Sequence, residues 1–181
     1  MIQISKGRPA PSGRSDTENR AYDLLDRLGI EYTRADHSPA DTMEICADIS
    51  LRLGVSICKN LFLTNRQQTD FYLLLMPPDK PFKTKFLSKE LGVSRLSFGS
   101  ADQMEALLGV HPGSVSVLGL MNDTDGKVRL VIDSDLLKEE HFGCHPCVNT
   151  SSVKLLTRDV TETLLPALGR EATYVTLAVE E

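Results

Sequence analysis

Two apolar segments lie close together in the middle of the chain: Cys58-Lys-Asn-Leu-Phe-Leu-Thr64 and Phe71-Tyr-Leu-Leu-Leu-Met76. Each has the composition of a β-strand, and the polar segment 65–70 between them predicts the turn of a hairpin. Pro77 and Pro78 end the second strand, because proline lacks the N–H group that a strand ladder uses. The hairpin makes the two strands antiparallel, which argues against a doubly wound parallel sheet. We therefore predict an α+β fold in which helices flank a mixed β-sheet.

The remaining predicted elements alternate irregularly around this hairpin. Ser15-Asp-Thr-Glu18 is a capping-box pattern, and it predicts the start of a helix that ends at Gly29. Thr42 and Thr157 are expected helix caps, another helix is expected to begin near Ser100, and Gly54 and Gly92 are expected to end helices. Further helices are predicted at 43–53, 83–91, 101–108 and 158–168, and further strands at 30–35, 95–98, 128–132, 153–156 and 173–178.

Length and composition indicate one domain. The chain has 181 residues, of which 41% are hydrophobic, and this suits a single domain over residues 15–181. Residues 1–14 contain glycines and prolines, and we expect a flexible lead-in. No segment has the length and hydropathy of a membrane span, and no signal peptide is evident, so we expect a cytoplasmic protein with no membrane partner. The four cysteines are then expected to be reduced.

The charge of the chain is unevenly distributed. The net charge is −5, which argues against indiscriminate binding of nucleic acid. Residues 50–95, however, hold eight Lys or Arg residues against three acidic residues. Such a segment can contact a phosphate backbone locally, although a solvated, lysine-rich helix face is the alternative.

Candidate site residues are concentrated in the segment His141-Phe-Gly-Cys-His-Pro-Cys-Val-Asn-Thr150. One interpretation is a metal or redox site built on Cys144 and Cys147. The other is a pocket rim at which His145 and Asn149 contact a ligand. A structural zinc site normally needs a second cysteine pair, and a redox Cys-x-x-Cys motif normally opens a helix, which is not predicted here. We therefore assign no metal site and no cofactor.

Other positions can also bind a ligand. Lys59 begins a strand, where its ammonium group can be held beside a carbonyl or phosphate oxygen or can extend into water. The loop 109–119 is rich in glycine and serine and can present backbone groups, although it lacks the ending of a P-loop. Asp133 and Asp135 follow a predicted strand, where they can bind a metal or cap a helix; we favour capping.

Five motifs occur along the chain in one order: Lys59-Asn-Leu-Phe-Leu63; Leu96-Ser-Phe-Gly-Ser100; Gly113-Ser-Val-Ser-Val-Leu-Gly-Leu120 with Asn122-Asp123; Val131-Ile-Asp133; and His145-Pro-x-x-Asn149-Thr150. This series resembles the YbaK/ProX prolyl-tRNA editing family, the freestanding relatives of the insertion domain of prolyl-tRNA synthetase. The resemblance covers nearly the whole chain. It implies an α+β editing domain that deacylates mischarged tRNA(Pro) in trans. The pattern is most similar to the alanyl-tRNA(Pro) deacylases, with the cysteinyl-tRNA(Pro) deacylases next.

The resemblance also implies which residues form the site. Lys59 corresponds to the functional lysine of the family, and His145 and Asn149 correspond to its His-Pro-x-x-Asn motif. Lys59 and His145 are thus expected to be catalytic. The implied partner is the acceptor end of tRNA(Pro) carrying a wrong amino acid, with prolyl-tRNA synthetase as a further candidate and no cofactor. The residues expected to contact the substrate are Gly113, Ser114, Val115, Ser116, Val117, Gly119 and Asn149.

The chain departs from the family pattern at Val117, where the family loop has proline. Proline fixes φ and removes an N–H group, so its replacement can change the shape of the loop and the choice of amino acid. A module that binds aminoacyl-tRNA or an amino acid without hydrolysis is therefore an alternative. For a deacylase, the aminoacyl ester is already activated, so positioning and charge stabilisation suffice, and the 2′-hydroxyl of the terminal adenosine can assist water.

Overall fold

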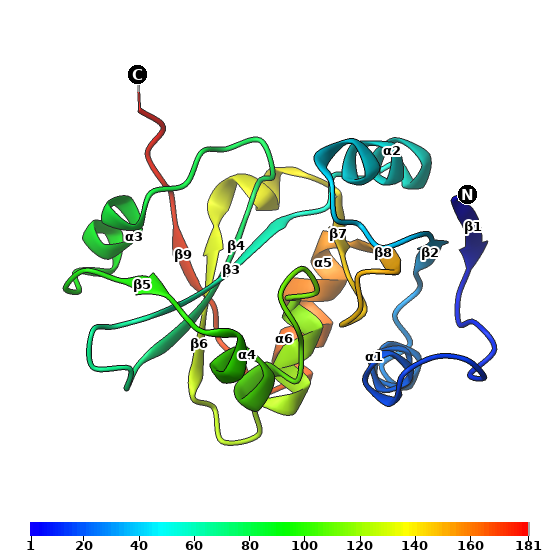
Figure 1. Cartoon of the computed structure of the whole chain (residues 1–181), viewed down its shortest axis with the longest axis horizontal. Helices are drawn as coiled ribbons and strands as arrows, with labels where there is room; N and C mark the ends of the chain where they lie inside the picture. Colours follow the sequence, from blue (N-terminus) through cyan, green and yellow to red (C-terminus); the bar gives the residue numbers. More distant parts are fainter. Residues whose placement is uncertain (181) are drawn as a thin grey trace.

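The computed structural model describes residues 1–180 and contains two β-sheets with helices packed around them (Figure 1). The larger sheet has the strand order β5 (Ser97–Phe98), β3 (Lys59–Thr64), β4 (Phe71–Met76), β6 (Val128–Asp133) and β9 (Thr173–Val175). The smaller sheet has the order β1 (Gln3–Lys6), β2 (Thr33–Asp36), β8 (Ser151–Leu156) and β7 (His141–Cys144). The α-helices are α1 (Asp16–Arg27), α2 (Met43–Leu53), α3 (Thr84–Leu91), α4 (Ala101–Leu108), α5 (Thr157–Asp159) and α6 (Leu165–Ala167). Three further helical segments are η1 (Val117–Asn122), η2 (Ser134–Lys138) and η3 (Val160–Leu164).

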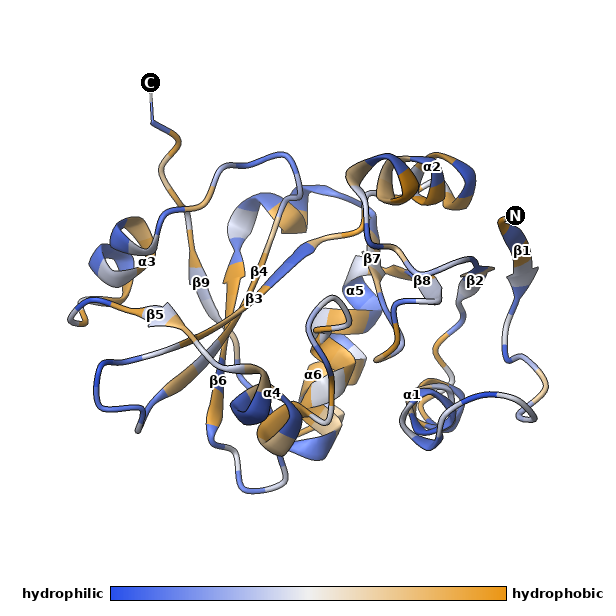
Figure 2. Ribbon diagram, viewed as in Figure 1, coloured by the Kyte–Doolittle hydropathy of each residue, from blue (hydrophilic) through white to orange (hydrophobic). Residues whose placement is uncertain are grey.

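Strand β4 lies at the centre of the larger sheet. It pairs antiparallel with β3 and parallel with β6, which confirms the predicted hairpin and the predicted mixed sheet. Leu73 and Leu75 face a core shared with the smaller sheet, whereas Leu74 and Met76 face a second core that includes Leu87 of α3. A continuous apolar run is typical of a strand that is buried on both faces. Figure 2 accordingly shows β4 and β6 as apolar segments in the middle of the molecule.

The sequence patterns predict the two inner strands of the smaller sheet, β2 and β8, but neither of its edge strands. Strand β1 lies within residues 1–14, for which we predict a flexible lead-in, and it pairs antiparallel with β2, so that expectation is wrong for residues 3–6. Strand β7 begins the segment 141–150 and pairs antiparallel with β8. Both are short edge strands without a long apolar run, and such strands carry only a weak signal in the sequence.

Most helix ends lie where the capping patterns predict them. Ser15, Thr42 and Ser100 each accept a hydrogen bond from the backbone N–H three residues further on, at the starts of α1, α2 and α4. Helices α2 and α3 end at Gly54 and Gly92, which adopt the left-handed conformation. Within residues 1–180, no helix has both the length and the apolar character that crossing a membrane requires.

The predicted helix over 158–168 is interrupted. Thr157 does not cap it, because the hydroxyl of Thr157 donates a hydrogen bond to the Glu139 carbonyl oxygen at 2.6 Å. Between α5 and α6 the chain forms the π-helical segment η3. A helix is therefore present, but the predicted cap is wrong. The π turn inserts extra chain without altering the apolar pattern enough to be recognised from sequence.

The two sheets meet at Ile57 and Gly143, which form a parallel β-bridge. Beside this bridge, the N–H of Cys58 donates to the Gly143 carbonyl oxygen at 3.0 Å. A Cβ atom at position 143 would lie 2.9 Å from the Ser56 carbonyl oxygen, so the approach requires glycine. The bridge places the start of β3 beside the end of β7.

A buried ion pair lies after the ends of β4 and β6, at the same end of the larger sheet as the start of β3. Lys80 Nζ lies 2.7 Å from Asp133 Oδ2 and 2.8 Å from Asp135 Oδ2. Burial disfavours the ammonium form of Lys80, but the two carboxylates outweigh burial and raise its pKa. Asp133 also accepts the N–H of Asp135 at the start of η2, which confirms the predicted capping role.

Replacing Lys80 by Met is expected to lower the free energy of unfolding by about 3–5 kcal/mol, because Asp133 would stay buried without its counter-charge. Urea unfolding measures this change. The matched control is Lys127→Met, since the Lys127 side chain is 60% exposed. The control is expected to stay within about 0.5 kcal/mol of the parent. An unchanged unfolding midpoint in Lys80→Met would show that the ion pair does not stabilise the fold.

Candidate functional site

A small pocket lies where the two sheets meet. Its volume is about 150 Å³, and it is lined by Cys58 and Asn60 from the start of β3, Gly113 and Val115 from the loop after α4, and His145 from the loop after β7. Sites for drug-sized ligands usually occupy about 300–1,000 Å³. The pocket therefore suits a small chemical group at the end of a larger molecule.

The structure does not place Lys59 in this pocket. Successive side chains of a strand point to opposite faces, so Cys58 and Asn60 share one face of β3 while Lys59 lies on the other, with Leu61. Lys59 Nζ donates a hydrogen bond to the Lys80 carbonyl oxygen at 2.7 Å. The ammonium group thus lies beside the backbone of Lys80, the residue whose side chain forms the buried ion pair.

His145 is brought to the pocket with a defined ring orientation. Its Nδ1 lies 2.9 Å from the Ser151 carbonyl oxygen, which can only accept a hydrogen bond. The neutral ring therefore carries its proton on Nδ1 and has its lone pair on Nε2. Burial lowers the pKa of His145, since it leaves the side chain only 9% exposed, and the nearby His37 lowers it further. Near neutral pH the ring is accordingly uncharged.

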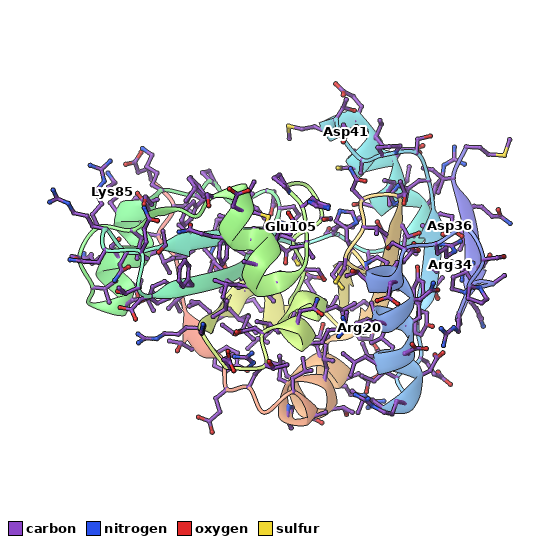
Figure 3. The ribbon with its side chains drawn as sticks, turned by 60° about the horizontal axis from the view of Figure 1, so that its bottom comes forward. Arg20, Arg34, Asp36, Asp41, Lys85 and Glu105 are labelled. Carbon is purple, nitrogen blue, oxygen red and sulfur yellow. The ribbon has the colours of Figure 1, made fainter. Side chains whose placement is uncertain are left out.

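Asn149 lies beside the glycine loop. A Cβ atom built on Gly113 would be 3.9 Å from Asn149 Nδ2. The same Nδ2 donates to Asp41 Oδ1 at 3.2 Å, and the Asn149 carbonyl accepts the N–H of Ala40 at 3.0 Å. Figure 3 shows Asp41 at the start of α2. Asn149 therefore connects the beginning of α2 to one wall of the pocket.

Three expected substrate contacts in the loop instead support the loop itself. Ser114 Oγ bonds the backbone of His111, donating to its carbonyl at 2.8 Å and accepting its N–H at 3.1 Å. Ser116 Oγ caps η1 by accepting the N–H of Leu118. A Cβ atom on Gly119 would lie 3.1 Å from the Leu108 carbonyl oxygen, so Gly119 allows η1 to pack against α4. Of the expected loop residues, only Gly113 and Val115 line the pocket.

Val117 occupies the first position of η1, and its side chain is fully buried. The N–H of the first helical residue needs no partner within the helix, which is why proline is favoured at this position. Valine and proline can therefore serve the same local structure. The replacement of the family proline by Val117 is thus compatible with a helix that begins at this residue.

Cys144 and Cys147 are buried thiols. Burial raises the pKa of each to about 12, so neither is a thiolate near neutral pH. Metal binding and redox catalysis both need the thiolate. Among residues 1–180, no group of three or more His, Cys, Asp or Glu side chains is arranged to hold a metal ion. The arrangement thus favours the pocket-rim interpretation of residues 141–150.

The basic segment 50–95 does not form one free basic surface. Much of its charge is engaged in ion pairs, namely Arg52 with Asp48, Lys80 with Asp133, and Lys83 and Lys85 with Glu180. Figure 3 also places Lys85, on α3, at the opposite end of the molecule from Asp41. Four of the eight basic residues of this segment are therefore paired with acidic residues.

The fold and the pocket define a known class of domain. A family model of the aminoacyl-tRNA editing domain matches residues 37–163, and the chain belongs to this family. Membership confirms the resemblance seen in the sequence and the predicted class of enzyme, a hydrolase of mischarged aminoacyl-tRNA.

Individual relatives narrow the comparison to prolyl-tRNA editing. The chain is 32% identical over 154 residues to the prolyl-tRNA editing protein ProX of Acetoanaerobium sticklandii, covering 85% of this chain and 93% of that protein. It is 28% identical over 159 residues to prolyl-tRNA synthetase associated domain-containing protein 1 of Danio rerio, covering 87% and 86%. A crystal structure described provisionally as a trans-editing enzyme for prolyl tRNA synthetase has a TM-score of 0.68 at 14% identity, covering 92% and 100%, which supports the fold.

Sequence reasoning missed Cys58, Asn60, His37 and Ser152 as residues of the site. Cys58 and Asn60 could have been found by applying strand alternation to β3, because they must share the face opposite Lys59. His37 and Ser152 contact His145 only through the pairing of β2, β8 and β7. Such pairing of distant segments leaves no local signal in the sequence.

Replacing Val117 by Pro is expected to leave the free energy of unfolding within about 1 kcal/mol of the parent, because the site has the geometry of a first helical residue. Thermal and urea unfolding measure the effect. Val131→Pro is the contrasting variant, since Val131 lies in β6 between two paired strands and needs its N–H. A loss of folding in Val117→Pro as large as that in Val131→Pro would contradict this account of the loop.

Proposed function

We propose that this protein removes alanine from mischarged tRNA(Pro) in trans. Family membership supports the reaction class, and the pocket of about 150 Å³ supports a small amino acid. The pocket size supports a small amino acid, and the resemblance of the sequence pattern to the alanyl-tRNA(Pro) deacylases carries the choice of alanine among the small ones. We further propose that the protein acts in the cytoplasm on the acceptor end of tRNA(Pro) that carries a wrong amino acid. Prolyl-tRNA synthetase, which charges this tRNA, is a further candidate partner.

The proposed reaction is the attack of water on the aminoacyl ester while the amino acid occupies the pocket. The ester needs no strong nucleophile, so the chain has to position the ester and stabilise negative charge on its carbonyl oxygen. In this proposal the Nε2 lone pair of His145 accepts a hydrogen bond from the terminal adenosine or from the attacking water. Asn60 Nδ2 already donates to the Cys58 carbonyl oxygen at 3.0 Å and retains a second N–H for the substrate.

Lys59 has a separate role in the proposal. An ammonium group has three N–H donors, and the Lys80 carbonyl oxygen occupies one of them. The two others are proposed to bind the terminal phosphate or the ester carbonyl where these pass the start of β3. The buried ion pair of Lys80 supports this role, because it holds the carbonyl that orients Lys59.

Rejection of proline is proposed to rest on shape. A difference of one methylene group changes binding by only about 1–3 kcal/mol, so affinity alone does not separate similar small side chains. In this proposal the ring of proline clashes with Val115 or His145, which line the pocket, and is excluded sterically. Cysteine is only slightly larger than alanine, and cysteinyl-tRNA(Pro) is the second candidate substrate for this reason.

With purified protein, alanyl-tRNA(Pro) is expected to be deacylated faster than the cysteinyl and seryl species, while prolyl-tRNA(Pro) stays intact. Loss of the radiolabelled aminoacyl group measures the rates, with buffer alone as the control for spontaneous hydrolysis. The rates are expected to be the same with and without a chelator, since the proposed steps use only side chains. Faster loss of cysteine would reassign the substrate. Tight binding of charged tRNA without turnover would show that the protein is a binding module and not a deacylase.

The variant Lys59→Ala is expected to lower the rate of deacylation by about 10²–10³-fold, which is typical for removal of one group that stabilises developing charge. Lys127→Ala is the matched control, because Lys127 is an exposed lysine outside the residues that line the pocket. Circular dichroism and unfolding midpoints show whether both variants fold. A rate within a few-fold of the parent in folded Lys59→Ala would remove Lys59 from the mechanism.

A further inference from the structure

Two buried histidines are connected behind the pocket by one serine. His37 follows β2, His145 follows β7, and Ser152 lies in β8, which pairs with both strands. Ser152 Oγ is 2.9 Å from His37 Nε2 and 3.2 Å from His145 Nδ1. The two ring centroids are 6.3 Å apart. Ser152 is fully buried and each histidine is 9% exposed, so water does not readily replace these contacts.

Backbone carbonyls at both ends fix the direction of the hydrogen bonds. His37 Nδ1 lies 2.8 Å from the Ser38 carbonyl oxygen, so the neutral His37 ring has its proton on Nδ1 and a lone pair on Nε2. That lone pair accepts the hydroxyl proton of Ser152. His145 Nδ1 donates to the Ser151 carbonyl oxygen and shares the same proton with Ser152 Oγ. One arrangement of protons therefore gives every donor a hydrogen-bond acceptor in the series that runs from His145 through Ser152 to His37.

His37 determines whether Ser152 can donate to His145. A serine hydroxyl has one proton and two lone pairs, so it can donate or accept. While His37 Nε2 takes the proton, Ser152 can only accept from His145 Nδ1. Without His37, the hydroxyl can rotate and donate to Nδ1. This donation competes with the hydrogen bond from Nδ1–H to the Ser151 carbonyl oxygen, and it raises the population of the other tautomer of His145, with the proton on Nε2. That tautomer would present a donor instead of a lone pair on the ring nitrogen assigned to the substrate.

Charged groups reach this cluster through the neighbouring Ser151. Its hydroxyl donates to Asp36 Oδ1 at 2.7 Å and to Glu18 Oε1 at 3.3 Å, and Arg14 lies 3.0 Å from Asp36 and 2.6 Å from Glu18. Figure 3 shows Asp36 and Arg34 together on β2, and Arg34 Nε also pairs with Asp36 at 3.0 Å. On the pocket side, His145 and Cys58 both line the pocket, and burial keeps the Cys58 thiol protonated. The histidines thus bond to neutral serines while the charges are paired with one another.

We propose that His37 is a positioning residue that acts through Ser152, together with the Ser151 carbonyl oxygen, to hold His145 in the tautomer whose Nε2 is unprotonated. The inference rests on the proposed function only in giving His145 Nε2 a role toward the substrate. The tautomer itself is a property of the free protein. A similar outer hydrogen bond fixes the ring and the tautomer of histidines in metal sites. There its loss typically lowers metal affinity or activity about 10–100-fold.

Four variants separate this role from packing. His37→Leu removes the acceptor for the Ser152 proton. His37→Gln keeps an amide oxygen that can accept it. Ser152→Ala removes the hydroxyl and leaves the Ser151 carbonyl as the acceptor for His145. The double variant His37→Leu/Ser152→Ala removes both the acceptor and the hydroxyl that the acceptor restrains.

Two-bond ¹H–¹⁵N correlation spectra of the ¹⁵N-labelled full chain report the tautomer of His145. The parent, His37→Gln, Ser152→Ala and the double variant are expected to show the proton on Nδ1, and His37→Leu is expected to show a gain of protonation on Nε2. In the deacylation assay, kcat of His37→Leu is expected to fall about 10–100-fold with KM little changed, and His37→Gln is expected to restore it.

An unchanged His145 tautomer in folded His37→Leu would overturn the proposal, as would a tautomer change that persists in the double variant. A fall in kcat that His37→Gln does not restore would also overturn it, because it would indicate that the ring of His37 acts only by packing. The spectra are recorded without tRNA, so they decide this inference separately from the assay that decides the proposed function.

Discussion

The bridge between Ile57 and Gly143 is the contact on which the site depends. It joins a mixed sheet to an antiparallel sheet, and each sheet supplies one wall of the pocket. Because position 143 has no room for a side chain, backbone atoms set the separation of the walls. Side chains can change rotamer to fill or open a space, whereas two backbones in contact leave little freedom. A pocket built in this way can discriminate by shape.

The alternation of side chains along β3 places the pocket on one face of the strand and the ammonium group of Lys59 on the other. Cys58 and Asn60 face the pocket, and Lys59 faces the edge where Lys80 is buried with its acids. The register that causes this separation is held by the pairing of β3 with β4 and by the burial of Leu63. A slip by one residue would exchange the two sets of side chains. A substrate that contacts both sets has to pass around the end of the strand, which a single-stranded acceptor end can do.

The features predicted from sequence are those that local residues determine. Thr42 and Gly54 delimit α2 because capping and the left-handed glycine are local properties of the backbone, and the hairpin follows from two apolar runs joined by a polar turn. The edge strands of the second sheet could not be predicted in this way, since they acquire their partners from distant segments. The same applies to the site. The motifs identified His145, Asn149 and the glycine loop, but the direction of the Lys59 side chain follows from strand register.

The burial of Cys58 has a consequence for the fate of an ester bound in the pocket. A thiolate beside an aminoacyl ester would capture the acyl group as a thioester, and the enzyme would then carry the amino acid itself. Burial raises the pKa of the Cys58 thiol far above neutral pH, so the protonated sulfur is a poor nucleophile. The side chain therefore behaves as a small apolar wall, and in the proposed reaction water would not compete with the Cys58 sulfur for the acyl carbon.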